Sequence, residues 1–237
     1  MPRNIFDSHA HYDDERFDPD REALLASLPG AGVSFVISCG SDLANSAKAV
    51  ELASRYDYIY AAAGVHPQEC GDGVDLDELR RLLSLPKIVA LGEIGLDYYY
   101  PEPARQAQKF WFARQLEAAH DTGLPVLIHN RDAHADTLEI LKKHRPPGVM
   151  HCFSGSVEYA REILSLGMHI GLGGTVTFKN ARHPKEVAAM VPLERLLLET
   201  DAPYLAPEPL RGSRCDSSMI AHTARAIADI RGMDVQE

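Results

Sequence analysis

Residues 33–37 read Val33-Ser34-Phe35-Val36-Ile37, a run in which apolar or β-branched side chains occupy nearly every position. A strand with one face in water would alternate apolar and polar residues, so this run is typical of a strand buried on both faces of a parallel sheet. The strand is expected to end at Cys39, and a helical stretch, Leu43–Arg55, follows with Asp42 as a possible N-cap. The segment predicts one strand-helix repeat.

The same repeat recurs along the whole chain. Eight strands are expected at Asn4–Ser8, Val33–Cys39, Tyr58–Gly64, Ile88–Gly92, Pro125–His129, Gly148–His151, His169–Leu172 and Leu196–Thr200. Eight helices are expected at Pro19–Ser27, Leu43–Arg55, Leu76–Leu83, Pro103–Thr122, Ala133–His144, Val157–Leu166, Ala181–Met190 and Ser217–Arg231. Strict alternation predicts an α/β fold with a parallel sheet, and eight repeats without a long break predict closure into a (β/α)₈ TIM barrel. An open doubly wound sheet is the alternative.

Length and charge limit the other possibilities. The chain has 237 residues, close to the roughly 250 residues typical of one TIM barrel. No linker or low-complexity segment divides it, so we expect a single hydrolase domain over residues 1–237. The formal net charge of -10 argues against a broad nucleic-acid groove, because an acidic surface repels a polyanion at long range. Bound divalent cations would reverse the local field, so phosphate chemistry at a metal site stays possible.

Cysteine usage and the apolar segments bear on the cellular compartment. The cysteines form no CxxC pair, which favours reduced thiols in a cytoplasmic protein over a disulfide framework; they are Cys39, Cys70, Cys152 and Cys215. The first residues lack the apolar stretch of a signal peptide. No uncharged run approaches the roughly 20 residues needed to span a bilayer. We therefore expect a cytoplasmic monomer with neither a membrane nor an obligate protein partner.

Six side chains that can bind metal occur at the ends of five expected strands: His9, His11, Glu93, His129, His151 and Asp201. In a barrel these ends lie on one face, where the active site of this fold sits. His9 and His11 are two residues apart on an extended segment, so their rings point to the same side and can reach one ion. Imidazole and carboxylate ligands suit zinc, manganese or magnesium, and this set does not choose between them. The pattern predicts a divalent metal site.

Six segments around these residues form characteristic motifs: Phe6-Asp7-Ser8-His9-Ala10-His11, Gly64-Val65-His66-Pro67, Gly92-Glu93-Ile94-Gly95-Leu96-Asp97-Tyr98, His129-Asn130-Arg131-Asp132-Ala133, His151-Cys152-Phe153-Ser154-Gly155 and Glu199-Thr200-Asp201-Ala202-Pro203-Tyr204. These segments resemble the TatD family of metal-dependent deoxyribonucleases, a branch of the amidohydrolase-like superfamily. They cover nearly the whole chain in the order of the family.

The resemblance implies a two-metal hydrolase. It implies that Glu93 bridges two divalent ions, with His9, His11 and Asp201 completing one site. The other site would be completed by His129 and His151. The implied reaction is hydrolysis of phosphodiester bonds by a hydroxide that the two ions activate, with Asp201 as the proton acceptor and Glu93 as the shared ligand.

Five further side chains are candidates for substrate binding. Arg131 follows His129 by two residues, and its guanidinium can hold a phosphate in bidentate fashion. Lys179 and Arg211 follow the seventh and eighth expected strands and are similar candidates. His66 can bind substrate or act as an acid, and Phe153 can stack on a base. Each of these residues also has an ordinary interpretation as a surface or packing side chain.

The chain departs from the family pattern in three places. The family usually continues with another helix after the segment matching Ile227–Gly232, whereas this chain ends at Glu237, so we expect that helix to be missing. Cys215-Asp216-Ser217 stands where Asn-Glu-Pro is common, and Gln68 stands where histidine is common. These differences affect the expected substrate contacts more than the expected metal site.

Three functions compete on the sequence. The leading one is hydrolysis of DNA at single-stranded or frayed ends. The second is hydrolysis of another ester, such as the aminoacyl ester on transfer RNA, or of a small amide or lactone, because the same activated water serves acyl transfer. The third is a metal-stabilised binding protein without turnover, which the presence of all six ligands disfavours. Arg131, Lys179 and Arg211 favour a phosphate-bearing substrate without separating the first two functions.

Overall fold

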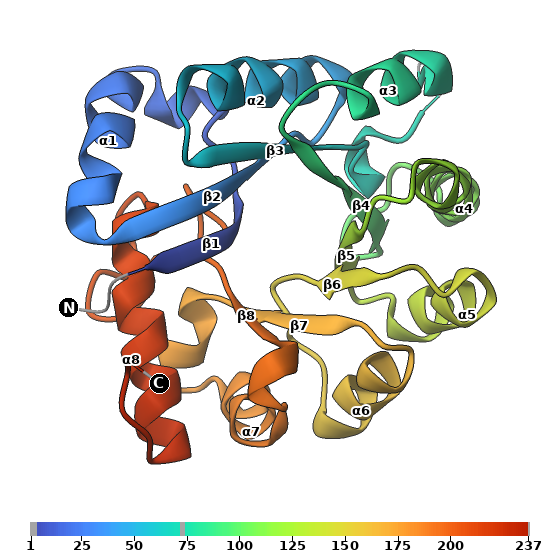
Figure 1. Ribbon diagram of the computed structural model, residues 1–237. Helices are drawn as coiled ribbons and strands as arrows, with labels where there is room; N and C mark the ends of the chain where they lie inside the picture. Colours follow the sequence, from blue (N-terminus) through green and yellow to red (C-terminus); the bar gives the residue numbers. More distant parts are fainter. Residues whose placement is uncertain (1–3, 72–73, 237) are drawn as a thin grey trace.

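Eight parallel strands form the centre of the computed structural model, which describes residues 4–71 and 74–236 (Figure 1). The strands are β1 Ile5–Ala10, β2 Val33–Cys39, β3 Ile59–Ala63, β4 Ile88–Asp97, β5 Val126–Arg131, β6 Gly148–Met150, β7 His169–Leu172 and β8 Leu196–Leu198. Each strand pairs in parallel with the next one along the chain. The predicted parallel sheet of eight strands is therefore confirmed.

The first and last strands meet and close the barrel. The amide of Asp201 donates to the carbonyl of His9 at 2.9 Å, and the amide of His11 donates to the carbonyl of Ala202 at 2.6 Å. Ala10 and Ala202 form an isolated parallel bridge. Because these contacts join the two ends of the sheet, the fold is a TIM barrel and not the open doubly wound sheet considered as the alternative.

Within the described part of the chain, eight α-helices lie around the outside of the strands (Figure 1). They are α1 Arg21–Ser27, α2 Leu43–Arg55, α3 Leu76–Leu83, α4 Arg105–Thr122, α5 His134–His144, α6 Val157–Ser165, α7 Arg182–Met190 and α8 Ile220–Arg231. The predicted N-caps are present: the Asp42 side chain accepts from the amide of Asn45 at 2.7 Å, and the Asp75 side chain accepts from the amide of Glu78 at 3.1 Å. Among the described residues, no helix combines the length and apolarity that a membrane crossing requires.

The helices pack on the barrel through fully buried apolar side chains. Leu79 and Leu82 of α3 and Phe112 of α4 belong to the largest such cluster, which extends over β3 to β7. A smaller cluster, which includes Ile37 and Leu127, lies inside the barrel. Apolar side chains on both the helix-facing and the inward-facing surfaces of the sheet explain why several strands read as continuous apolar runs.

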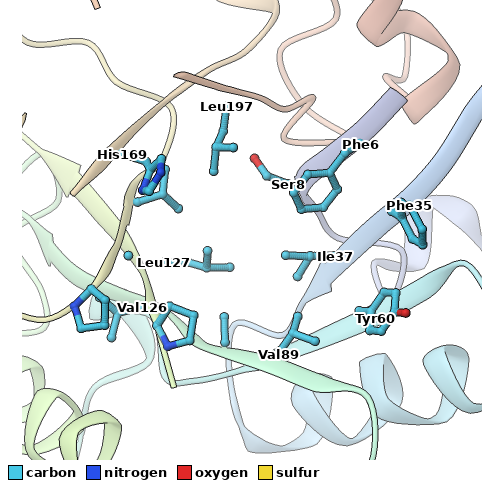
Figure 2. A pocket seen from close by; sticks show the side chains of 15 residues that line it. Phe6, Ser8, Phe35, Ile37, Tyr60, Val89, Val126, Leu127, His169 and Leu197 are labelled. Atoms are coloured by element: carbon cyan, nitrogen blue, oxygen red, sulfur yellow. The ribbon is translucent and has the colours of Figure 1, made fainter. Parts of the chain in front are cut away.

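An open apolar hollow of about 590 Å³ lies in the amino-terminal half of the barrel (Figure 2). Ile37, Leu127 and Leu197 point into it from β2, β5 and β8, and Ser8 and His169 are among the few polar side chains in its lining. On β1, β4, β5, β6 and β8, the residues that line this hollow precede the predicted metal ligands in the chain. The chemistry of this molecule is therefore to be found at the opposite, carboxyl-terminal face.

Candidate metal centre

A polar hollow of about 900 Å³ occupies the carboxyl-terminal face of the barrel. Five of the six predicted metal ligands line it: His11, Glu93, His129, His151 and Asp201. The sixth, His9, is completely buried beneath them. The barrel thus brings together residues that are separated by up to 192 positions along the chain, from His9 to Asp201.

His9, His11 and Asp201 form one group of ligand atoms. The Nε2 atoms of His9 and His11 lie 3.2 Å apart, and Asp201 Oδ1 lies 3.5 Å from His11 Nε2 and 3.9 Å from His9 Nε2. The Nδ1 atom of His11 is 2.7 Å from the carbonyl oxygen of Cys39, which can only accept a hydrogen bond. In the neutral ring the proton therefore sits on Nδ1, and the Nε2 lone pair faces the group, as a metal ligand requires.

Glu93 connects this group to a second one. Its Oε1 atom lies 2.7 Å from His129 Nδ1 and 2.7 Å from His151 Nε2. Its Oε2 atom lies 3.5 Å from His11 Nε2 and 3.6 Å from His9 Nε2. One carboxylate therefore presents one oxygen to each pair of histidines, which is the arrangement expected of a bridging ligand.

The donor set fits divalent cations. Three sets of three ligand atoms each lie within 4.8 Å of one another, namely His9, His11 and Asp201, then His9, Glu93 and His151, and finally His66, Glu93 and His129. Imidazole nitrogens and carboxylate oxygens in such groups suit zinc, manganese and related ions. The burial of these ligands supports the same conclusion, because uncompensated charges in a buried site are costly.

Protons and negative charges balance in this cluster. Burial alone would raise the pKa of Glu93, but the surrounding histidines hold it well below its usual range. Burial lowers the pKa of His11 and His129, but the hydrogen bond from His11 to Asp201, and those from His129 to Asp97 and Glu93, outweigh burial and raise the values to about 10 and about 9. A cation bound here would replace those protons as the positive partner of the carboxylates.

The structure corrects the expected end of the fourth strand. That strand was expected to stop at Gly92, but β4 continues to Asp97, so Glu93 lies inside the strand. Pairing with β5 is irregular between Leu91 and Ile94, and such bulges re-aim a side chain. A Cβ atom at Gly92 would lie 2.7 Å from the carbonyl oxygen of Leu127, so glycine is required at this point. The glycine marks a bulge and not a strand end.

Two buried acids behind the ligands were not predicted. Asp97 Oδ2 lies 3.3 Å from His129 Nε2, and Glu199 Oε1 lies 3.8 Å from His151 Nδ1 and accepts a hydrogen bond from the amide of Cys152. Burial raises the pKa of Glu199 to about 8, and its Oε2 atom has no hydrogen-bond partner among the described residues. Asp97 is within hydrogen-bonding distance of its histidine, whereas Glu199 faces His151 Nδ1 without a hydrogen bond; outer carboxylates in such positions orient histidines where these bind a metal.

A third buried acid, Asp7, lies at the seam between β1 and β8. Its carboxylate accepts hydrogen bonds from Thr200 Oγ1 and Ser217 Oγ, both at 2.6 Å. Ser217 belongs to the segment that departs from the family pattern, so that segment takes part in closing the barrel. All three acids lie in or next to the motif segments, but a linear sequence does not show which ligand each one faces.

The structure places some of the candidate substrate-binding residues at the polar hollow and others away from it. His66 and Arg131 line the polar hollow, and His66 Nε2 lies 3.7 Å from Glu93 Oε1. Lys179 and Arg211 are exposed and are not among the lining residues of this hollow; the Arg211 guanidinium lies over the ring of Phe178 at 4.3 Å.

Phe153 is only 2% exposed and stacks on Tyr159 with ring centroids 5.7 Å apart. Its ring belongs to the main apolar cluster around β3 to β7, so it offers no free face to a nucleobase. The packing interpretation of Phe153 therefore fits the structure better than base stacking.

The model of a protein family described as TatD related DNase matches residues 6–237. The chain belongs to the TatD family. A relative from Bacillus subtilis, named uncharacterized metal-dependent hydrolase YabD, is 40% identical over 238 residues, which cover 98% of this chain and 93% of that protein. Another TatD relative, from Cronobacter sakazakii, is named a 3'-5' ssDNA/RNA exonuclease and is 36% identical over 97% of this chain and 91% of its own.

A solved TatD-family structure has the same fold. The TatD homologue YJJV from Escherichia coli superposes with a TM-score of 0.92 at 35% identity, covering 99% of this chain and 93% of that one. The match confirms the TIM barrel over nearly the whole length. The chain is accordingly a metal-dependent hydrolase of the TatD family, and its clustered histidines and carboxylates fit divalent metal binding.

Proposed function

We propose that this TatD-family hydrolase cleaves phosphodiester bonds at single-stranded ends of DNA with two divalent ions. His9, His11 and Asp201 would hold one ion, His129 and His151 would hold the other, and Glu93 would bridge them. The observation that carries the proposal is the orientation of Glu93, whose two oxygens lie 2.7 Å and 3.5 Å from histidine nitrogens of the two groups. The relative named a ssDNA/RNA exonuclease supports a nucleic-acid substrate.

Divalent ions in such a pair lower the pKa of a coordinated water and neutralise charge on the phosphoryl oxygens. Asp201 is the proton acceptor in this proposal. Burial opposes its ionisation, but the hydrogen bond with His11 and the nearby charges of His151 and His9 lower its pKa below the usual value. It therefore stays a carboxylate at neutral pH and can accept the proton that the attacking water loses.

His66 is the proposed hydrogen-bond donor to the substrate. Burial lowers its pKa to about 3, so the ring is neutral at physiological pH. Its Nδ1 atom accepts a hydrogen bond from the amide of Gln68 at 3.2 Å, which places the single ring proton on Nε2. That nitrogen is the one that faces Glu93, so the N–H group is available to a phosphoryl or leaving-group oxygen at the metal centre.

The test compares three substrates with one metal-loaded preparation. A labelled DNA strand with a single-stranded 3' end, the same DNA as a blunt duplex and an aminoacyl-tRNA are incubated with the protein and manganese or magnesium. We expect shortening of the single-stranded end, with a rate loss of about 10²- to 10⁴-fold in Asp201→Asn, the usual contribution of a positioned general base. Asp57→Asn is the matched control and should leave the rate unchanged, because Asp57 is exposed and precedes β3 at the amino-terminal face of the barrel, opposite the metal centre.

The outcomes separate the competing functions. Release of the amino acid without DNA cleavage would identify the ester hydrolase, and the nuclease proposal would be abandoned. Binding of metal without turnover of any of the three substrates would favour the non-catalytic binding protein.

A further inference from the structure

Two clusters of arginine and tyrosine flank the metal centre. In the first cluster, the Arg131 guanidinium lies 3.8 Å from the ring centroid of Tyr99 and 5.6 Å from that of Tyr100. In the second, the Arg16 guanidinium lies 4.4 Å from the ring centroid of Tyr204. Arg131 and Tyr100 of the first cluster and both members of the second line the polar hollow that holds the metal ligands.

The barrel topology places the two clusters on opposite sides of the mouth. Tyr99 and Tyr100 follow β4, and Arg131 ends β5. Arg16 follows β1, and Tyr204 follows β8. Because the strands are arranged in the order β1 to β8 and β8 meets β1, the β4–β5 pair lies across the barrel from the β8–β1 pair. The metal ligands of β1, β4 and β5 lie between the clusters.

The aromatic rings of both clusters are open to a ligand. Tyr100 is 46% exposed and Tyr204 is 40% exposed, although large aromatic side chains are usually well buried. The first cluster is also held in place, because the amide of Tyr98 donates to the carbonyl of Arg131 at 2.9 Å. Among the described residues, the Arg131 guanidinium has no hydrogen bond or ion pair with a carboxylate, so its charge is available to a phosphate.

Acidic side chains around the polar hollow oppose the approach of a polyanion, so binding of a nucleic acid here needs short-range contacts such as these clusters provide. Outside the metal ligands, acidic side chains outnumber basic ones in the lining; the acids are Asp13, Asp14, Glu15, Glu69 and Asp97, and the bases are Arg16, Lys48 and Arg131. Long-range attraction to a nucleic acid is therefore weak, in agreement with the net charge of -10. Stacking on tyrosine and arginine supplies short-range binding that does not depend on net charge, and it tolerates any base because every base has a π face.

We propose that the two clusters are stacking platforms that hold the nucleobases on either side of the scissile phosphate of a single strand. The inference rests on the proposed nuclease function and specifies its substrate. One base stacks on Tyr100 and Arg131, and the base across the phosphate stacks on Tyr204 and Arg16. A duplex cannot bind in this way, because its bases are already paired and stacked on one another. The site thus selects unpaired strands and engages a nucleotide on each side of the bond it cleaves.

The experiment pairs substrates that lack one base with variants that lack one ring. Single-stranded oligonucleotides carry an abasic residue immediately before or immediately after the scissile phosphate, and cleavage and binding are compared with the intact strand. The intact chain should prefer each base-bearing strand over its abasic counterpart by about 5- to 150-fold, the effect of one stacked base. Tyr100→Leu should abolish this preference on one side of the phosphate and keep it on the other, and Tyr204→Leu should do the reverse.

Conservative and remote variants serve as controls. Tyr100→Phe and Tyr204→Phe keep an aromatic ring and should keep the preference for the base-bearing strand. Phe110→Leu removes a ring that is 57% exposed on α4 and is not among the lining residues of the polar hollow, so it should also keep the preference.

The possible outcomes distinguish this inference from the proposed function. Cleavage with the same base preference in both leucine variants overturns the platforms and leaves the nuclease in place. If the protein binds but does not cleave the strands, the nuclease is rejected, and the base preference in binding still decides the platforms. Absence of single-strand binding rejects both.

Discussion

Replacing Gln115 with leucine should destabilise the protein by about 2–5 kcal/mol. Gln115 is fully buried on α4, where its Oε1 atom accepts from the amide of Val65 at 2.8 Å and its Nε2 atom donates to the carbonyl of Val65 at 3.0 Å. Leucine has a similar volume but leaves both backbone groups of Val65 without a partner in a buried site. Each unpaired buried group costs about 1–3 kcal/mol, and the added apolar contact offsets a small part of the sum.

The loss is a large share of the stability of a typical domain, which is about 5–15 kcal/mol. The substitution also removes the two hydrogen bonds that hold the backbone of Val65. Because Val65 precedes His66, Gln115 helps to place a side chain of the proposed active site. Urea denaturation monitored by circular dichroism measures this change. The midpoint urea concentration should fall, while the slope of the unfolding free energy against urea concentration stays the same.

Gln106 is the matched control, because it is exposed on the same helix and its replacement by leucine removes no buried hydrogen bond. Gln106→Leu should change the free energy of unfolding by less than about 0.5 kcal/mol. The reasoning is refuted if Gln115→Leu is as stable as the wild type, or if both variants lose the same amount.

Three further outcomes are expected. Glu199→Gln should weaken metal affinity by about 10- to 100-fold, because Glu199 faces His151 Nδ1 and such carboxylates orient metal-binding histidines. Competition with a chelator measures the affinity, and an unchanged value would contradict this role of Glu199. Metal binding at pH 7 should release protons, because His11 and His129 have raised pKa values of about 10 and about 9. The release should decline as the pH rises through this range. Calorimetry in buffers of different ionisation enthalpy measures it, and a binding enthalpy that does not depend on the buffer would contradict the prediction. Burial raises the pKa of the Cys70 thiol to about 12, so a thiol reagent at pH 8 should modify it slowly in the native protein and quickly in urea; equal rates would contradict its burial.

The fold was predictable because its signals are local. Continuous apolar runs such as Val33-Ser34-Phe35-Val36-Ile37 mark buried strands, and Asp42 and Asp75 mark helix starts. Each signal depends on a few neighbouring residues, so the chain order alone is enough to find it. Closure into a barrel follows from the number of repeats, and Ala10 of β1 does form a parallel bridge with Ala202, just beyond the end of β8.

The outer parts of the site were not predictable because they depend on packing between distant segments. Glu199 is next to a recognisable motif residue, yet its contact with His151 arises only when β6 and β8 are both in place. Gly92 carries the signature of a strand end, but its close approach to Leu127 makes it a bulge. Phe153 follows the candidate metal ligand His151 by two residues and nevertheless belongs to the apolar core.

The central claim is that six side chains hold two ions that share Glu93, and metal analysis of the purified protein tests it most directly. After loading with manganese or zinc and removal of free metal, the wild type should retain two ions per chain, and Glu93→Gln should retain less than one. Glu69→Gln, at an exposed position on the rim of the same hollow, should retain both ions. A wild type that holds a single ion, or a Glu93→Gln variant that still holds two, would contradict the bridged centre.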